Sequence, residues 1–320
     1  MLTSTKEALH TAAETIYRYM TPTAEICWPL LSKRTGAEVW VKHENHAPTG
    51  AFKIRGGLNY MSNLIASERD CPGVIAATRG NHGQSVALSC SKVGLPSTIL
   101  VPQGNNPEKN DAMNAFGTEL IEHGHDFEAA KQYAANLAEE RNLHMIKSFH
   151  PWLVAGVGTY AMEFFTTVPD LHTVYVPIGQ GSGIVGVISA RDALGLKTDV
   201  VGVVAENAAS YALSFKAGKA VSTNSADTIA DGMACRVPDG DALEAILKGA
   251  ARVITLSDDE ILEAMGCYFV DTHNTSEGAG AAPLAGLLKE RDLMAGRKVG
   301  VILSGGNADK GLYTRALGMV

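Results

Sequence analysis

Lys53 is the side chain of this sequence best placed for covalent chemistry. It follows two small residues and Phe52, and it precedes Arg55-Gly56-Gly57. Partial desolvation and the neighbouring guanidinium of Arg55 would keep part of the lysine amine neutral, and a neutral amine attacks aldehydes. The pattern predicts a nucleophilic lysine at the start of a helix. An ordinary surface lysine at a helix start has the same local sequence, so this residue alone does not decide the chemistry.

Three glycine-rich loops supply a second kind of chemistry, the binding of anions. They occupy residues 78–83, 179–183 and 304–307, and each directly follows a short apolar run rich in β-branched residues. In open parallel sheets, ligands bind beyond the carboxyl ends of the strands, where backbone N–H groups at helix starts face an anion. We therefore expect all three loops at one sheet edge, with loop 179–183 wrapped around a phosphate group.

The second loop also matches a competing motif. Residues 181–186 satisfy G-x-G-x-x-G, and Glu206 lies 20 residues beyond the last glycine, where an acidic residue would bind a ribose hydroxyl. This pattern predicts an NAD-dependent oxidoreductase. Against it, the glycine run already begins at Gly179, and the motif leaves Lys53 and Ser304 without a role. The Walker lysine is absent, so a nucleoside triphosphatase is not indicated.

The elements that must position these loops are short buried strands that alternate with helices. This alternation predicts an α/β fold with parallel sheets covered on both faces. The expected helices span residues 1–20, 84–93 and 184–193. The expected strands span residues 38–42, 73–77, 97–101, 174–178, 200–205 and 299–303.

Composition excludes several classes of function. The 27 basic and 34 acidic residues give a formal charge of −7, which offers no surface for nucleic acid or anionic lipid. No apolar run approaches the length of a membrane helix, about 20 residues. The five cysteines are scattered and odd in number, which indicates free thiols in a reducing cytoplasm. We expect no metal site, because the histidine-containing clusters lack a third and fourth ligand.

The motifs together resemble the serine/threonine dehydratase family, pyridoxal-phosphate enzymes built like the tryptophan synthase β subunit. The resemblance covers nearly the whole chain and implies fold type II, two interleaved three-layer αβα domains. Residues 1–46 and 147–320 would form the large domain, and residues 47–146 the small domain that closes over the active site. The matching segments, in the order of the family, are residues 44–57, 80–83, 179–183, 229–232, 276–281 and 304–307.

The resemblance also implies roles for individual residues. Lys53 would bind pyridoxal 5'-phosphate as a Schiff base and later remove the substrate's α-proton, and Ser304 would face the pyridine nitrogen. The implied cofactor-binding residues are Phe52, Lys53, Asn81, Gly179, Gln180, Gly181, Ser182, Gly183 and Ser304. The implied substrate-binding residues are Thr78, Arg79, Gly80, Asn81 and His82.

The implied reaction is β-elimination from a hydroxy amino acid such as L-threonine or L-serine, which yields a 2-keto acid and ammonia. Hydroxyaspartate and phenylserine are alternative substrates, and the resemblance implies a homodimer. Arg79 stands where many members of the family have serine or another small residue. It could bind a second substrate carboxylate, as in hydroxyaspartate, or it could form a structural salt bridge.

Overall fold

The apolar runs of the sequence form two separate sheets. The structure, a computed structural model, describes residues 3–320. The larger sheet has six strands in the order β1-β2-β10-β7-β8-β9, all parallel except β1. Its strands are β1 (Glu25–Cys27), β2 (Glu38–His43), β10 (Lys298–Leu303), β7 (Thr173–Pro177), β8 (Asp199–Ala205) and β9 (Arg252–Leu256).

The smaller sheet has four parallel strands in the order β5-β4-β3-β6. All of them come from the middle of the chain, between the two segments that build the larger sheet. They are β5 (Glu119–Glu122), β4 (Ser97–Val101), β3 (Val74–Ala77) and β6 (His144–Met145). The chain thus leaves the larger sheet after β2 and returns to it with β7. Residues 47–146 remain our proposal for the small domain.

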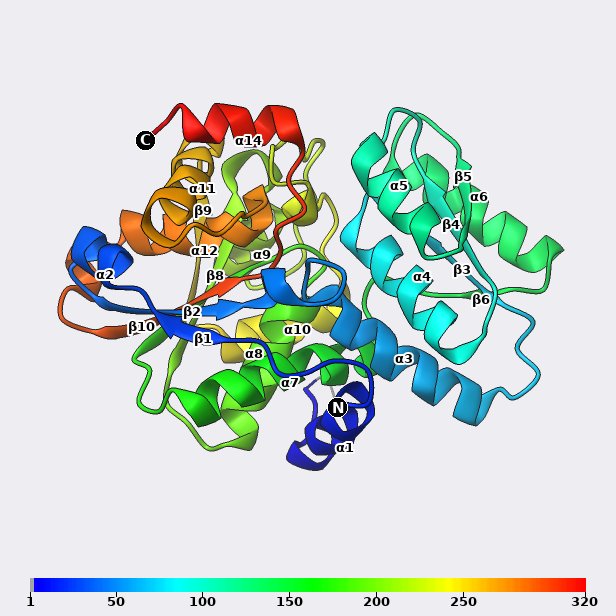
Figure 1. Ribbon diagram of the computed structural model, residues 1–320, viewed down its shortest axis with the longest axis horizontal. Helices are drawn as coiled ribbons and strands as arrows, with labels where there is room; N and C mark the ends of the chain where they lie inside the picture. Colours follow the sequence, from blue (N-terminus) through cyan, green and yellow to red (C-terminus); the bar gives the residue numbers. More distant parts are fainter. Residues whose placement is uncertain (1–2) are drawn as a thin grey trace.

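Helices cover both faces of each sheet, as the uninterrupted apolar strands predict. In the larger sheet, α11 and α12 pack on one face and α7 and α8 on the other (Figure 1). In the smaller sheet, α6 contacts one face and α3 and α4 contact the other. Strand β3 shows why both faces are filled: Val74 and Ala76 point to the α3–α4 side, whereas Ile75 and Ala77 point to α6.

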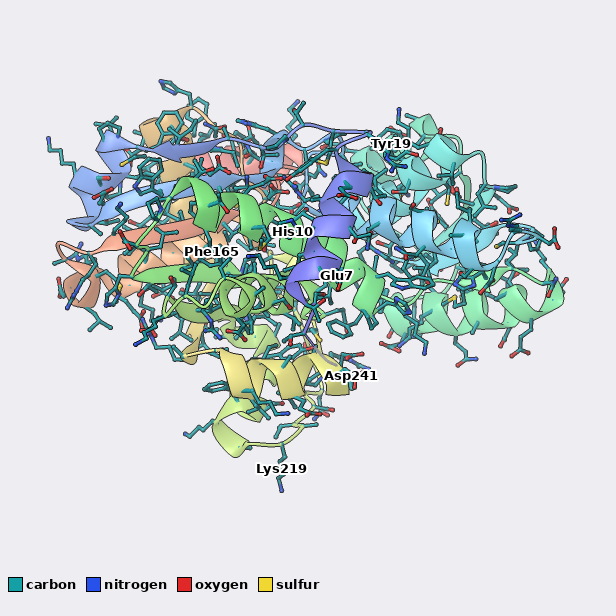
Figure 2. All side chains as sticks on the ribbon, turned by 90° about the horizontal axis from the view of Figure 1, so that it is seen from below. Glu7, His10, Tyr19, Phe165, Lys219 and Asp241 are labelled. Carbon is teal, nitrogen blue, oxygen red and sulfur yellow. The ribbon has the colours of Figure 1, made fainter. Side chains whose placement is uncertain are left out.

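The helices begin and end as follows. They are α1 (Lys6–Ile16), α2 (Pro29–Thr35), α3 (Lys53–Ser67), α4 (Asn81–Val93), α5 (Pro107–Ala115), α6 (Phe127–Glu140), α7 (Pro151–Thr167), α8 (Ser182–Ala193), α9 (Ser210–Ala217), α10 (Gly240–Gly249), α11 (Asp258–Thr272), α12 (Gly278–Lys289), α13 (Arg291–Met294) and α14 (Lys310–Leu317). Figure 2 shows α1, with Glu7 and His10, lying across the junction between the two parts.

Each strand that the sequence predicts is present, with ends that shift by one residue at most. The helix expected over residues 1–20 is shorter: it ends at Ile16, and residues 1–2 lie outside the described part of the chain. In residues 3–320, no helix is both long enough and apolar enough to span a bilayer.

Candidate active site

Lys53 is the first residue of α3, as its sequence context predicts. The backbone N–H of Phe52 donates to the Ser304 carbonyl oxygen at 2.9 Å, which ties the start of α3 to the end of β10. The Lys53 amine lies 4.8 Å from the centre of the Phe52 ring and donates to Ser182 Oγ at 3.1 Å. Burial lowers the pKa of this amine to about 8, and Glu277 opposes the shift. The chain therefore holds a reactive amine beside the second glycine-rich loop.

The loop from Gly179 to Gly183 joins β7 to α8 and presents unpaired backbone donors. Among the described residues, none of its five amide N–H groups has an acceptor. Unpaired amides at the start of a helix form an anion site, so the loop fits a phosphate group. The Gln180 side chain donates to Cys235 Sγ at 3.4 Å, and Gln180 therefore contributes its backbone.

Two glycines in this loop are required by its shape. A Cβ atom at Gly179 would lie 2.2 Å from the carbonyl oxygen of Gly232. Gly181 has φ +99°, a left-handed conformation that disfavours other residues. The loop can adopt its closely turned path only with glycine at both positions.

The turn between β3 and α4 holds the predicted substrate-binding residues. Thr78 Oγ1 accepts from the amides of Gly80 and Gly83 at 3.0 and 3.2 Å, so these two N–H groups are already used. The amides of Asn81 and His82, in the first turn of α4, stay unpaired among the described residues. These two amides, with that of Arg79, are donors available to a carboxylate.

The His82 side chain carries no positive charge that could attract an anion. Burial and the neighbouring Lys53 lower the pKa of its imidazole to about 3, so the ring is neutral at pH 7. Its Nε2 atom is buried and has no partner within the described part of the chain. His82 can therefore offer a hydrogen bond to a ligand but not a positive charge.

One cavity of about 730 Å³ brings the predicted residues together. Arg79 is exposed on its wall and forms no salt bridge within residues 3–320, which argues against the structural alternative for this side chain. Glu206 is not among the lining residues. The lining includes every predicted site residue: Phe52, Lys53, Thr78, Arg79, Gly80, Asn81, His82, Gly179, Gln180, Gly181, Ser182, Gly183 and Ser304.

Three of the charged residues that line the cavity, Glu277, Lys109 and Asp231, lie close together and are not among the predicted site residues. Lys109 binds Asp231 at 2.5 Å and lies 4.0 Å from Glu277 Oε2. Burial raises the pKa of the Glu277 carboxyl, and Lys109 opposes the shift. Burial would lower the pKa of Lys109, but Glu277 and Asp231 outweigh it and raise that pKa. Glu277 and Asp231 do lie in matching motifs, whereas nothing in the sequence marks Lys109.

Within residues 3–320, no group of three or more histidine, cysteine, aspartate or glutamate side chains is arranged to hold a metal ion. The five cysteines are free thiols.

A family model described as "Pyridoxal-phosphate dependent enzyme" matches residues 16–305, which is most of the chain. The chain belongs to this family. Pyridoxal phosphate is the family's cofactor, and the lysine, the loop of free amides and the cavity fit it. The predicted family, α/β fold and cofactor are thus confirmed. The nicotinamide alternative is not supported, because residues 181–183 of its motif belong to the loop that fits this cofactor's phosphate.

Two curated relatives are similar over most of the chain. The L-threonine ammonia-lyase of Thermotoga maritima is 34% identical over 98% of this chain and 77% of its own length. The L-threo-3-hydroxyaspartate ammonia-lyase of Saccharomyces cerevisiae is 32% identical over 94% of this chain and 93% of its own length. Both relatives are ammonia-lyases.

Solved structures of the same fold include two plant enzymes. The processed threonine deaminase isoform 2 of Solanum lycopersicum superposes with a TM-score of 0.91 at 28% identity, covering 100% of this chain and 95% of that one. Maize serine racemase gives a TM-score of 0.92 at 26% identity, covering 98% and 97%. The arrangement of two sheets is therefore shared with a threonine deaminase and a serine racemase.

Proposed function

We propose that this protein is a pyridoxal-phosphate-dependent ammonia-lyase that converts a β-hydroxy amino acid, L-threonine or L-serine, to a 2-keto acid and ammonia. One observation carries the proposal. The Lys53 amine, whose pKa is lowered to about 8, lies 3.1 Å from Ser182 in a loop of unpaired amides. The names of the two curated relatives, both ammonia-lyases, are a second support for the proposal.

The residues of the cavity would divide the work. The amides of the 179–183 loop would hold the cofactor phosphate, and Phe52 and Ser304 would bind its ring. The first turn of α4 binds the substrate carboxylate. When bound, pyridoxal phosphate delocalises the electron pair that remains at the substrate's α-carbon.

Lys53 would be the base of the reaction. A neutral amine takes the α-proton at Nζ, and a lowered pKa makes that form available near neutral pH. Loss of the β-hydroxyl, which leaves as water after it gains a proton, then gives an unsaturated amine. Hydrolysis of this amine releases the 2-keto acid and ammonia.

The test is an assay of keto acid release from L-threonine, L-serine, threo-3-hydroxyaspartate and phenylserine. We expect turnover of at least one of the four with one ammonia released per keto acid. The proposal would be refuted if keto acid formation needed a nicotinamide cofactor. It would also be refuted if none of the four amino acids gave a keto acid.

Arg79 favours threo-3-hydroxyaspartate as a second candidate substrate. It is an exposed guanidinium on the cavity wall, directly before the residues proposed to bind the α-carboxylate. A guanidinium binds carboxylate through two parallel hydrogen bonds. Arg79→Ser should then reduce kcat/KM for hydroxyaspartate by about tenfold or more relative to serine. Lys131→Ser, at another cation of the wall, is the control, and equal losses on all substrates would remove this candidate.

We also propose that the protein acts in the cytoplasm as a homodimer. The five free cysteines support a reducing compartment. The dimer rests on resemblance to the family alone, and sedimentation of the purified protein would test it.

A further inference from the structure

The Asn81 amide is held at both ends by residues from the other part of the molecule. Its Nδ2 donates to Glu277 Oε1 at 2.6 Å, and its Oδ1 accepts from Asn307 Nδ2 at 2.8 Å. Asn81 begins α4 beside the smaller sheet, whereas Asn307 follows β10 of the larger sheet. The orientation of the Asn81 side chain is therefore set by residues outside α4.

A backbone carbonyl fixes the direction of these hydrogen bonds. Asn307 Nδ2 also donates to the Thr49 carbonyl oxygen at 2.8 Å. A carbonyl oxygen can only accept, so the nitrogen of Asn307 must face Thr49 and, with its second hydrogen, Asn81. Asn81 must then present its oxygen to Asn307 and its nitrogen to Glu277.

Glu277 is held in place to receive that nitrogen. Its backbone N–H donates to the Gly305 carbonyl oxygen at 3.1 Å, and the residue is only 3% exposed. Oε2 is buried without a hydrogen-bond partner among the described residues, and its nearest cation is Lys109, at 4.0 Å. Glu277 is thus a rigid acceptor and cannot turn to solvent.

Asn81 keeps one unused donor. An asparagine side chain has two amide hydrogens, and Glu277 accepts one of them. The second has no acceptor within residues 3–320, although Asn81 lines the 730 Å³ cavity that also contains Lys53. This N–H has no acceptor in the described protein and is therefore available to a ligand in the cavity.

We propose that Glu277 and Asn307 are positioning residues that fix Asn81 so that its second amide N–H donates to an oxygen of bound pyridoxal phosphate. This inference rests on the proposed function. Neither Glu277 nor Asn307 acts on substrate in it, because each works through Asn81.

The test is a double-mutant cycle on the affinity of the protein for pyridoxal phosphate, measured by absorbance titration and separate from activity. Asn81→Ala and Glu277→Ala should each weaken binding by about tenfold, the effect of one hydrogen bond worth about 1.4 kcal/mol. If Glu277 acts through Asn81, the double variant should bind no more weakly than Asn81→Ala. A double variant whose loss of affinity equals the product of the two single losses would overturn the inference.

A conservative variant separates geometry from charge. Glu277→Gln keeps an acceptor oxygen, so it should recover most of the affinity that Glu277→Ala loses. A Gln variant as weak as the Ala variant would contradict a positioning role. Glu290→Ala is the matched control, since Glu290 binds Tyr175 and Arg252 and does not line the cavity.

Asn307→Ala keeps the inference testable if the Glu277 variants do not fold. It removes the donor to Asn81 Oδ1, and its effect should also vanish in the Asn81→Ala background. An effect of the same size in both backgrounds would overturn the inference. Failure of the unchanged protein to bind pyridoxal phosphate would instead refute the proposed function.

Discussion

At the scale of residues, the reactivity of Lys53 follows from its surroundings. Its amine is close to Phe52 and Ser182, and burial outweighs the attraction of Glu277, so the pKa falls from 10.5 to about 8. A lowered pKa in a lysine means that the neutral, nucleophilic form appears at lower pH. The side chain is thereby suited both to bind an aldehyde and to accept a proton.

This shift predicts how cofactor uptake depends on pH. In protein stripped of pyridoxal phosphate, the rate of covalent recapture should rise as the pH increases through about 8, where the Lys53 amine loses its proton. Stopped-flow absorbance between pH 6 and 10.5 would measure it. A midpoint near the ordinary lysine value, about 10.4, would contradict the predicted environment.

The sequence predicts individual site residues well only where a local pattern surrounds them. Lys53 and loop 179–183 have such patterns, and the structure places both on one cavity. Lys109 has none: it is a lysine in the first turn of α5, and only the fold brings it to Asp231. Lys109 and Asp231 are 122 positions apart, so no short sequence pattern marks the pair.

At the scale of elements, the connection from β7 to α8 carries the proposed anion site. Its glycines let the backbone turn sharply, so that the helix start and the loop amides face the same side. The loop packs closely against Gly232: a Cβ atom at Gly179 would collide with the Gly232 backbone. The Gly232 oxygen is a backbone atom, and a Cβ atom is fixed to its own backbone. The loop itself would therefore have to shift to relieve the clash.

Gly179→Ala should therefore weaken pyridoxal phosphate binding by at least tenfold and destabilise the fold by about 1–3 kcal/mol. Gly311→Ala is the control. Gly311 is exposed in α14, where a Cβ atom meets only Asp309 at 3.4 Å, so alanine should stabilise the helix by about 0.5–1 kcal/mol. Titration and urea unfolding would measure both. Unchanged binding in Gly179→Ala would show that the loop does not hold the phosphate.

Strands that are buried on both faces are the ones that the sequence predicts. β3, β8 and β10 are almost entirely buried and appear as continuous apolar runs. β5 and β9 are edge strands of partial burial, and β5 is bounded by glutamates. The sequence does not reveal such strands because their residues are mixed in polarity and only pairing with a neighbour defines them.

At the scale of the whole molecule, a buried ionic network joins segments that are distant in sequence. Arg55 of α3 contacts Glu44 and Glu163, and Lys42 of β2 contacts Glu163 and Glu25. The network thus links both sides of the insertion that carries the smaller sheet. Because the Arg55 and Lys42 side chains are fully buried, each charge depends on its partners.

Glu163→Gln should destabilise the protein by about 3–5 kcal/mol, since two buried cations would lose one shared counter-charge. Glu244→Gln removes an exposed partner of Lys248 and should cost about 0.5 kcal/mol or less. Urea unfolding followed by circular dichroism would compare the two. Equal stability of both variants would show that the network is not needed to hold the segments together.

The chemistry proposed for this cavity depends above all on a covalent bond between Lys53 and pyridoxal phosphate. Reduction of the purified holoenzyme with borohydride, followed by peptide mass spectrometry, measures it directly. We predict one phosphopyridoxyl group, located on Lys53, and loss of the visible absorption band in Lys53→Ala. Labelling of another lysine, such as Lys109, with Lys53 unmodified would contradict this account.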